Sequence, residues 1–483
     1  MEENDLLAVR RQKLERLLEN DLAPFGGRFD VDGSIAEVRS GFAEGKKVRA
    51  AGRITAHRNM GKSQFLDLSD ITGRIQIFVN LKELSVEEAA LFELLDLGDF
   101  LGVEGECFMT RTGELTVRVQ SFKLLSKALR PLPDKWHGIS DVEIRYRQRY
   151  LDLIANPESR KIFLQRIQIV QEIRRFLLER GFLEVETPMM QPVAGGAAAQ
   201  PFQTHHNALS LDLFLRVAPE LYLKRLLVSG FPKVFELNRN FRNEGISRRH
   251  NPEFTMLEVY WAYADFELMA NLVEELICRL AQTVIGTLKI EHKNADGTVS
   301  RTINLKRPWR RARYDDLIKS VDPDWFQRSK AEKLIRCHEI AVEAHPQMAE
   351  FEITQQVFEK LVEEKTFDPL FVTNLPADLV PLARQNPDRP GTVEVFELII
   401  NGQELSPGYS ELNDPIVQRQ RLLKQAGEET QKIDEDFLLA LEYGMPPAGG
   451  MGLGIDRLVM TLTGADSIRD VILFPQLKPK MSE

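Results

Sequence analysis

Residues 235–260 read FELNRNFRNEGISRRHNPEFTMLEVY, and their pattern predicts an antiparallel hairpin. Two short apolar runs, at 233–237 and 254–260, flank a polar loop that contains glycine and serine, which is typical of two strands joined by a long connection. Arg242 lies in the first arm, where a planar guanidinium suits a phosphate or a carboxylate and is costly if it is buried without a partner. The pattern alone leaves a second interpretation open, a solvated hairpin with scattered charges.

The residue order in this hairpin resembles a known motif. FRNE at 241–244, followed by RHNPEFTMLE at 249–258, is similar to the second signature motif of class II aminoacyl-tRNA synthetases in the form used by the lysyl enzymes. The resemblance implies that Arg242 grips the α-phosphate of ATP, that Phe254 stacks on adenine and that the loop 245–250 reaches the acceptor end of the tRNA. It also implies ATP contacts from Glu244, His250 and Asn251.

Length and composition bound the possible functions. The 483 residues predict two or three domains, and 43% hydrophobic with 28% charged residues are typical of a globular protein. The sequence has neither a membrane-length apolar run nor a basic, apolar leader at its start, which predicts a cytoplasmic protein without a membrane partner. Its three isolated cysteines favour neither disulfides nor structural zinc. The net charge of −9 argues against nucleic acid, but basic residues outnumber acidic ones at 45–74 and 216–250, where a polyanion can bind.

Residues 45–130 predict a small closed β-barrel of the OB type. Strand-like runs occur at 47–54, 64–68, 74–79, 100–108 and 115–124, with a helix near 86–95. Such barrels bind single-stranded nucleic acid by stacking bases on aromatic side chains. The segment 58–76 resembles the anticodon-binding face of lysyl-tRNA synthetases, which implies that Phe65 stacks on an anticodon base while Arg58 and Gln76 read base edges. Without this resemblance, Phe65 is more readily interpreted as a core residue of the barrel.

The remaining chain suggests a terminal extension, a linker and a second domain. Residues 1–44 contain an amphipathic helix at 5–20, which either packs on the body or touches tRNA. Prolines mark a linker at 131–150, and residues 151–483 form the second domain. A helix at 159–181 that leads into a strand resembles class II motif 1, which implies a homodimer.

Two segments point to the amino-acid substrate. GGAAA at 195–199 lets a backbone approach another group closely, although an ordinary loop is the default interpretation. APELYLKR at 218–225 puts a glutamate at a helix start, where it can simply cap the helix. The resemblance implies that Glu220 holds the α-amino group of L-lysine, and that Glu411, in GYSEL, pairs with its ε-ammonium. The other residues that it places around lysine are Gly196, Glu258, Tyr260, Tyr409 and Gly452.

The sequence VEVFELIINGQEL at 393–405 predicts a second hairpin, which turns at Asn401–Gly402. Glu397 and Glu404 fall on opposite arms near one end, and two facing carboxylates need a shared cation or cost energy. Ordinary surface acids are the alternative. The resemblance implies that both hold the Mg²⁺ that bridges the ATP phosphates.

GGMGLGIDRLVM at 449–460 is a glycine-rich strand that runs into a helix. Its glycines permit close approach to a flat ligand, and an arginine at a helix start can meet a phosphate. The order resembles class II motif 3, which implies ATP contacts from Gly454 and Arg457, with Arg457 on the γ-phosphate.

Together the motifs predict an α+β protein with an OB-type barrel ahead of a class II catalytic domain, an antiparallel sheet with helices. Residues 289–350 resemble an insertion in that domain. The implied activity is to join ATP and lysine into lysyl-adenylate and to transfer the lysyl group to the 3′ end of tRNA(Lys). Two residues near the lysine pocket depart from the family pattern: Gln200 stands in place of arginine and Pro407 in place of asparagine.

Three rivals remain open. A lysyl ligase that modifies a protein would typically lack the barrel. An aspartyl or asparaginyl ligase would want a basic side chain at the position of Glu411. A non-catalytic tRNA-binding paralogue would be expected to lose Arg242, Arg457 and the two hairpin acids, all of which are present.

Overall fold

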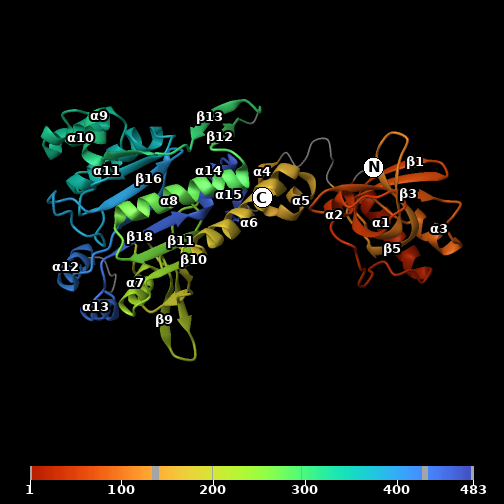
Figure 1. Cartoon of the computed structure of the whole chain (residues 1–483), viewed down its shortest axis with the longest axis horizontal. Helices are drawn as coiled ribbons and strands as arrows, with labels where there is room; N and C mark the ends of the chain where they lie inside the picture. Colours follow the sequence, from red (N-terminus) through yellow and green to blue (C-terminus); the bar gives the residue numbers. More distant parts are fainter. Residues whose placement is uncertain (1–2, 133–140, 198, 295, 427–432, 480–483) are drawn as a thin grey trace. The chain divides into compact units, whose positions relative to one another are not determined.

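The computed structural model describes residues 3–132, 141–197, 199–294, 296–426 and 433–479. Part of the predicted linker, 133–140, lies outside the described residues. The chain divides into two compact units, Met1–Arg160 and Lys161–Glu483 (Figure 1). Within the described ranges, no helix is long and apolar enough to cross a membrane.

The first unit contains the predicted barrel. Its strands close in the order β1-β2-β3-β5-β4, and alternate residues such as Ile75, Ile77 and Val79 point into a buried apolar core. Helix α3 begins at a capping box made by Ser85 and Glu88. The elements are α1 (Glu3–Glu19), α2 (Ile35–Ser40), β1 (Lys47–Met60), β2 (Ser63–Ser69), β3 (Arg74–Asn80), α3 (Val86–Glu93), β4 (Phe100–Met109) and β5 (Leu115–Ser126). The OB-type prediction is confirmed.

The N-terminal helix packs on this barrel. Leu17 of α1 is fully buried against Leu94 and Leu124, and Lys13 forms an ion pair with Asp96 at 2.7 Å. This contact agrees with the packed-helix interpretation. Two short helices follow, α4 (Val142–Arg147), which falls within the predicted linker, and α5 (Arg149–Ala155).

The second unit is built on a sheet with the order β14-β15-β16-β17-β18-β11-β10-β6. Neighbouring strands are antiparallel, except for the parallel pairs β10–β6 and β14–β15 at the two edges. The strands are β6 (Leu183–Glu184), β10 (Lys233–Phe241), β11 (Glu253–Ala262), β14 (Arg310–Arg313), β15 (Leu370–Thr373), β16 (Val395–Ile400), β17 (Gln403–Ser410) and β18 (Ala448–Gly454). The predicted antiparallel catalytic sheet is confirmed, and β14 comes from the segment that was predicted as an insertion.

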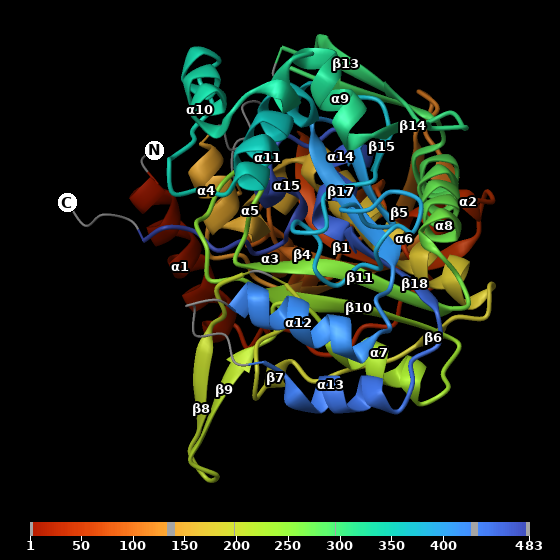
Figure 2. The ribbon, with the colours of Figure 1, turned by 90° about the vertical axis from the view of Figure 1, so that its left-hand side faces the viewer.

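The two faces of this sheet differ in chemistry because side chains alternate along each strand. Phe235, Val259 and Leu453 face helices α6 (Pro157–Leu178), α8 (Phe266–Leu280) and α14 (Ile455–Thr463), and belong to one buried apolar core (Figures 1 and 2). The register pairs Glu236 with Glu258, and Glu258 with Gly452. Polar and small residues therefore occupy the opposite face.

Two predicted boundaries differ from the structure, and one predicted turn agrees with it. Arg242 lies just after β10 rather than inside a strand, and its N–H donates to the carbonyl of Pro252. Apolar periodicity from Phe266 predicts a helix that reaches residue 288, but α8 continues only as a π-helix, Ala281–Ile285, and ends at Gly286. Gly286 has φ +88°, a left-handed conformation that glycine adopts without a Cβ clash. The predicted turn at Asn401–Gly402 is confirmed, with φ values of 60° and 71°.

The other elements of this unit surround the sheet. They are β7 (Met190–Gln191), β8 (Gln203–His206), β9 (Leu211–Leu215), α7 (Glu220–Val228), β12 (Lys289–Lys293), β13 (Val299–Asn304), α9 (Tyr314–Val321), α10 (Lys330–Glu339), α11 (Glu350–Leu361), α12 (Pro415–Ala426), α13 (Glu435–Glu442) and α15 (Ile468–Val471), with short 3₁₀ turns at Trp325–Gln327 and Glu363–Lys365. The β8–β9 hairpin extends away from the body of the unit (Figures 1 and 2).

Candidate active site

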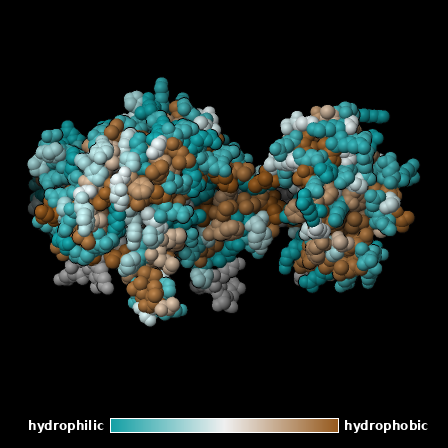
Figure 3. All heavy atoms as spheres, turned by 60° about the horizontal axis from the view of Figure 1, so that its bottom comes forward, coloured by the Kyte–Doolittle hydropathy of each residue, from teal (hydrophilic) through white to brown (hydrophobic). Residues whose placement is uncertain are grey.

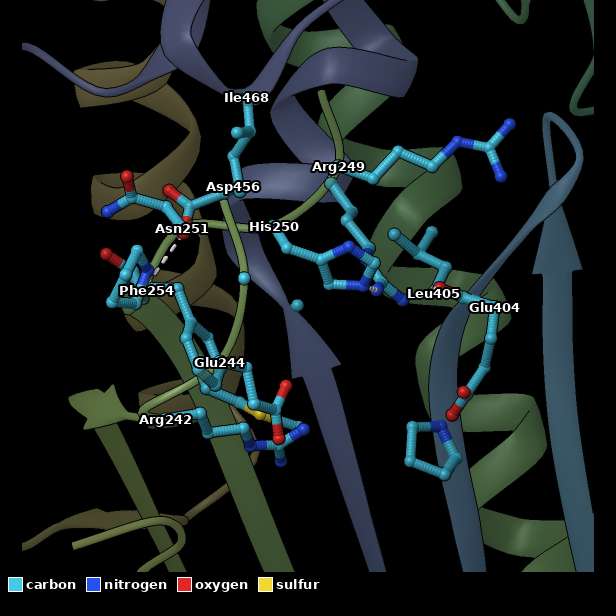
Figure 4. A pocket seen from close by; sticks show the side chains of 17 residues that line it. Arg242, Glu244, Arg249, His250, Asn251, Phe254, Glu404, Leu405, Asp456 and Ile468 are labelled. Atoms are coloured by element: carbon cyan, nitrogen blue, oxygen red, sulfur yellow. Dashed lines mark hydrogen bonds between the residues drawn. The ribbon is translucent and has the colours of Figure 1, made fainter. Parts of the chain in front are cut away.

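A cavity of about 200 Å³ opens on the polar face of the catalytic sheet. Figure 4 shows Arg242 and Glu244 on one side of it and Glu404 on the other, with His250 between them. Its walls come from the loop after β10, from β11 and β17, and from the start of α14. Of the residues named from the sequence, it is lined by Arg242, Glu244, His250, Asn251, Phe254, Glu404, Pro407, Gly454 and Arg457.

Arg242 has the properties of an anion-binding group. Its Cζ lies 5.2 Å from the centre of the Phe254 ring, and its Nε is buried with no hydrogen-bond partner in the described chain. Burial lowers the pKa of Arg242, while Glu244 and Glu404 oppose that change. A guanidinium placed in this way gains a partner when a phosphate enters the cavity.

Arg457 lies in the first turn of α14 and joins the two walls of the cavity. Its Nη1 donates to the carbonyl of Glu404 at 2.8 Å, and its Nη2 lies 3.1 Å from Nε2 of His250. Burial, and then the charge of Arg457, lower the pKa of His250. His250 is therefore neutral near pH 7, and Ser247 Oγ, 2.9 Å from its Nδ1, also fixes the ring. The N–H of Gln476 donates to the side chain of Asn251.

A second cluster of polar side chains, buried and called the buried pocket below, lies on the same face of the sheet. Among the described residues it brings together three carboxyl groups, Glu220 at the start of α7, Glu258 on β11 and Glu411 after β17. Tyr409 donates to Glu220 Oε1 at 2.7 Å, and Tyr260 donates to Glu258 Oε2 at 3.0 Å. Five of the seven residues that the resemblance assigned to lysine thus lie together: Glu220, Glu258, Tyr260, Tyr409 and Glu411.

Lys224 is the cation of this pocket. Its Nζ lies 2.7 Å from Glu220 Oε1 and 2.5 Å from Glu411 Oε2. Burial, and then the charge of Glu220, raise the pKa of Glu258 to about 8. Burial also raises the pKa of Glu411 to about 8, although Lys224 opposes the rise. The carboxyl groups outnumber the ammonium, so the pocket favours an added cation.

Glycines leave room for these side chains. A Cβ on Gly450 would lie 1.9 Å from Glu411 Oε1, so that any larger residue would displace the carboxylate. Gly196 has φ +89°, and its missing Cβ would lie 3.3 Å from the Cβ of Glu220. Gly452 pairs with Glu258 across the strands. The predicted close approach of backbone at these points is therefore built into the pocket wall.

The two acids of the second hairpin are near each other without being direct cross-strand partners. Glu397 pairs with Pro407 and Glu404 with Ile399, because a register shift separates the two pairs. Burial raises the pKa of Glu397 well above its usual value, and the charges of Glu404 and Glu363 add to the rise. The described residues contain no group of three or more acids, histidines or cysteines arranged to hold a metal ion.

The barrel brings the three predicted base-reading residues onto adjacent strands. Arg58 pairs with Phe65 across β1 and β2, and its Nη2 lies 2.8 Å from both Asp67 Oδ1 and Gln76 Oε1. Phe65 is half-buried, with its ring 5.1 Å from that of Phe78. It lies outside the buried apolar cluster of the barrel, so the core interpretation does not describe it.

Sequence reasoning missed three residues of these sites: Lys224, Glu363 and Asp67. Lys224 follows Glu220 by four positions on a helix, a spacing that by itself indicates an ion pair. Glu363 accepts the N–H of Glu404 and has its pKa raised to about 7, first by burial. It reaches the site from a 3₁₀ turn distant in sequence, and no local pattern indicates that placement.

Gln200 and Pro407, the two residues that depart from the family pattern, differ in whether they reach the cavity. The side chain of Gln200 is exposed, and its backbone carbonyl accepts the N–H of Asn243. Pro407 lies in β17, where it lines the cavity.

Comparison with known proteins identifies the family. Residues 141–478 match the tRNA synthetases class II (D, K and N), and residues 48–125 match the OB-fold nucleic acid binding domain. The chain is 52% identical to a lysine–tRNA ligase of Pelotomaculum thermopropionicum, over 99% of this chain and 96% of the relative. It is 50% identical to that of Carboxydothermus hydrogenoformans and 46% to that of Staphylococcus haemolyticus, over 99% of both chains in each case. The chain belongs to the class II tRNA synthetases and, within them, to the lysine–tRNA ligase family.

Proposed function

We propose that this enzyme joins L-lysine and ATP into lysyl-adenylate and transfers the lysyl group to the 3′ end of tRNA(Lys). The observation that carries this proposal is the surplus of buried carboxyl groups, Glu220, Glu258 and Glu411, over the single ammonium of Lys224. A buried negative surplus selects a substrate with more than one positive group. Glu220 meets the α-amino group and Glu411 meets the ε-ammonium. Tyr409 holds the carboxylate of Glu220, and Tyr260 holds that of Glu258.

The chemistry needs position and charge rather than a general base. The lysine carboxylate attacks the α-phosphorus in line, the bond from that phosphorus to the bridging oxygen breaks, and pyrophosphate leaves. Arg242 binds the α-phosphate where negative charge develops, and Arg457 binds the γ-phosphate. Phe254 stacks on adenine, while Glu244 and Asn251 orient the adenine or the ribose.

Glu397 and Glu404 are proposed to hold Mg²⁺. Their carboxylate oxygens are the ligands that Mg²⁺ prefers, and the neighbouring charges that most affect Glu397 are carboxylates that raise its pKa. Both observations fit an added divalent cation. When bound, the ion neutralises phosphate charge.

Pyrophosphate exchange measured with each of the twenty amino acids tests the proposal. We expect exchange with lysine alone and charging of tRNA(Lys) by the same protein. Exchange that depends on aspartate or asparagine would instead support an aspartyl or asparaginyl ligase of the same architecture. Lack of exchange with every amino acid would support a non-catalytic tRNA-binding paralogue.

The barrel is proposed to read the anticodon. We expect Phe65→Ala to weaken tRNA charging by about 1–3 kcal/mol, the usual contribution of one stacked base, without changing exchange in the absence of tRNA. Phe100→Ala is a matched control, because Phe100 is another partly exposed aromatic on the barrel, 4.3 Å from Arg53. Equal charging defects in both variants, or an exchange defect in Phe65→Ala, would mean that Phe65 acts through packing.

A homodimer in the cytoplasm is proposed as the working form. Figure 3 shows apolar residues, in brown, on the forward face of the catalytic unit. Helix α6 exposes Leu164 and Ile167, and the segment after it exposes Met189 and Met190. Exposed apolar side chains of this kind are typical of an interaction surface.

Lysine binding is expected to release protons. Because Glu258 and Glu411 have pKa values near 8 without substrate, part of each is protonated at pH 7, whereas an ammonium binds the ionised form. The Michaelis constant for lysine should therefore fall as pH rises from 6 to about 8 and then level off. Calorimetry in buffers of different ionisation enthalpy measures the protons released, and a heat of binding that is independent of the buffer would contradict the expectation.

A further inference from the structure

Lys224 lies between the two carboxylates that are assigned to opposite ends of the substrate. It extends from α7, is fully buried, and contacts Glu220 at 2.7 Å and Glu411 at 2.5 Å. The centre of the Tyr409 ring lies 5.7 Å from its Nζ. Glu220 belongs to the same helix, whereas Glu411 follows β17, so one ammonium joins two separate walls of the pocket.

A fully buried lysine is a costly way to join two elements of a fold. Burial by itself lowers the pKa of Lys224, but the charges of Glu220 and then Glu411 outweigh it and raise that pKa. The side chain therefore keeps its positive charge near pH 7. This positive charge therefore reduces the net negative charge that the pocket offers to a substrate.

The charge count matches the substrate. Among the described residues, the pocket holds three carboxyl groups and one ammonium, so the surplus is two negative charges when all are ionised. The charges of Glu236 and Arg216 also reach Glu258, but these two residues form an ion pair and add no net charge. Tyr260 and Tyr409 face the same space from β11 and β17, and burial raises the pKa of both well above the usual value, so they add hydroxyls without charge. Free L-lysine carries two ammonium groups, which equal the surplus, while its carboxylate is the group that reacts with ATP.

We propose that Lys224 is a specificity-determining positioning residue, which spaces Glu220 and Glu411 and limits the negative surplus of the pocket to the two charges of a diammonium substrate. The proposal rests on the lysine-activating function proposed above. Lys224 contacts the carboxylates rather than the reacting atoms. Without it, the carboxyl groups would repel one another more strongly and would hold protons up to a higher pH, and lysine would have to displace those protons.

Lys224→Met tests this in lysine-dependent pyrophosphate exchange. At pH 7 we expect the Michaelis constant for lysine to rise at least about thirtyfold, because a buried pair has lost one partner. The constant for ATP should stay within about twofold. The pH at which the lysine constant levels off should move up by at least about one unit, and the preference for lysine over norleucine, which lacks the ε-ammonium, should fall.

Lys127→Met is the matched control. Lys127 is also fully buried between two acids, 2.6 Å from Asp96 and 2.8 Å from Asp99, but it lies in the barrel unit. We expect that variant to lose thermal stability and to keep the lysine constant and its pH profile. The proposal is overturned if Lys224→Met keeps the wild-type lysine constant, or if its lysine and ATP constants rise in parallel.

A second pair of variants keeps the test decisive if Lys224→Met does not fold. Lys224→Arg retains the charge, so its Michaelis constant for lysine should level off at the same pH as in the wild type. For Lys224→Gln that constant should level off at a higher pH. If the lysine constant levels off at the same pH in both variants, the proposed role of the Lys224 charge is overturned. A wild-type enzyme that does not activate lysine would instead refute the proposed function, and that result is distinct from any change confined to the Lys224 variants.

Discussion

Arg242→Ala is expected to reduce lysine-dependent pyrophosphate exchange to about a thousandth of the wild-type rate or less. That loss lies in the upper part of the range for removing one preorganised transition-state contact. The guanidinium is half-buried beside Phe254, its Nε has no hydrogen-bond partner in the described chain, and it lines the cavity assigned to ATP. Neither water nor a lysine ammonium reproduces its planar fork, so Arg242→Lys should remain strongly impaired.

Arg239→Ala is the control for this experiment. Arg239 lies three residues earlier, on β10 itself, is exposed, and approaches Glu253 only to 3.9 Å. It should keep exchange close to wild type. Full exchange in Arg242→Ala, measured with saturating ATP and lysine, would remove Arg242 from the phosphate site and require another residue of the cavity to take that role.

Glu411→Gln is expected to raise the Michaelis constant for lysine at least about a hundredfold, since breaking a buried charge pair typically costs about 3–5 kcal/mol. Glutamine keeps the shape of the side chain and removes its charge. Lys224 and the substrate ammonium both lose a partner in this variant. ATP binds in a different part of the site, so its constant should change little.

Glu274→Gln separates a specific effect from general damage. Glu274 is equally buried, but it lies on α8 at the opposite, apolar face, 3.2 Å from Arg307 and bonded to the N–H of Trp309. Its replacement should lower the melting temperature and leave the lysine constant unchanged. If Glu411→Gln activates lysine normally, Glu411 is not the group that meets the ε-ammonium.

Local sequence patterns were sufficient to predict most helices, strands and turns, because each of these elements has a short-range physical cause. The barrel strands follow from alternating apolar residues, and the turn at Asn401–Gly402 follows from residues that tolerate positive φ. Helix ends were less predictable: periodicity carried the helix after Phe266 to residue 288, whereas Gly286 and a π-turn end it earlier.

The hairpin that carries Glu397 and Glu404 shows a limit of register arguments. Strand spacing placed Glu397 opposite Glu404, but a shift in pairing puts Pro407 opposite Glu397. Glu363 then joins the two acids from a 3₁₀ turn. One extra residue in a strand changes which side chains face each other, and a turn distant in sequence leaves no trace in the pattern.

The sequence by itself determined the barrel, the antiparallel sheet, the family and the acids, arginines and aromatics of the candidate sites. It did so because periodicity, turn residues and motif order are local properties. Only the tertiary structure decided how charge is balanced in the buried pocket. Packing α7 against β17 places the Lys224 ammonium between Glu220 and Glu411, and burial then fixes which of these groups carry a charge. Distance and desolvation, on which those charges depend, exist only once the chain has folded.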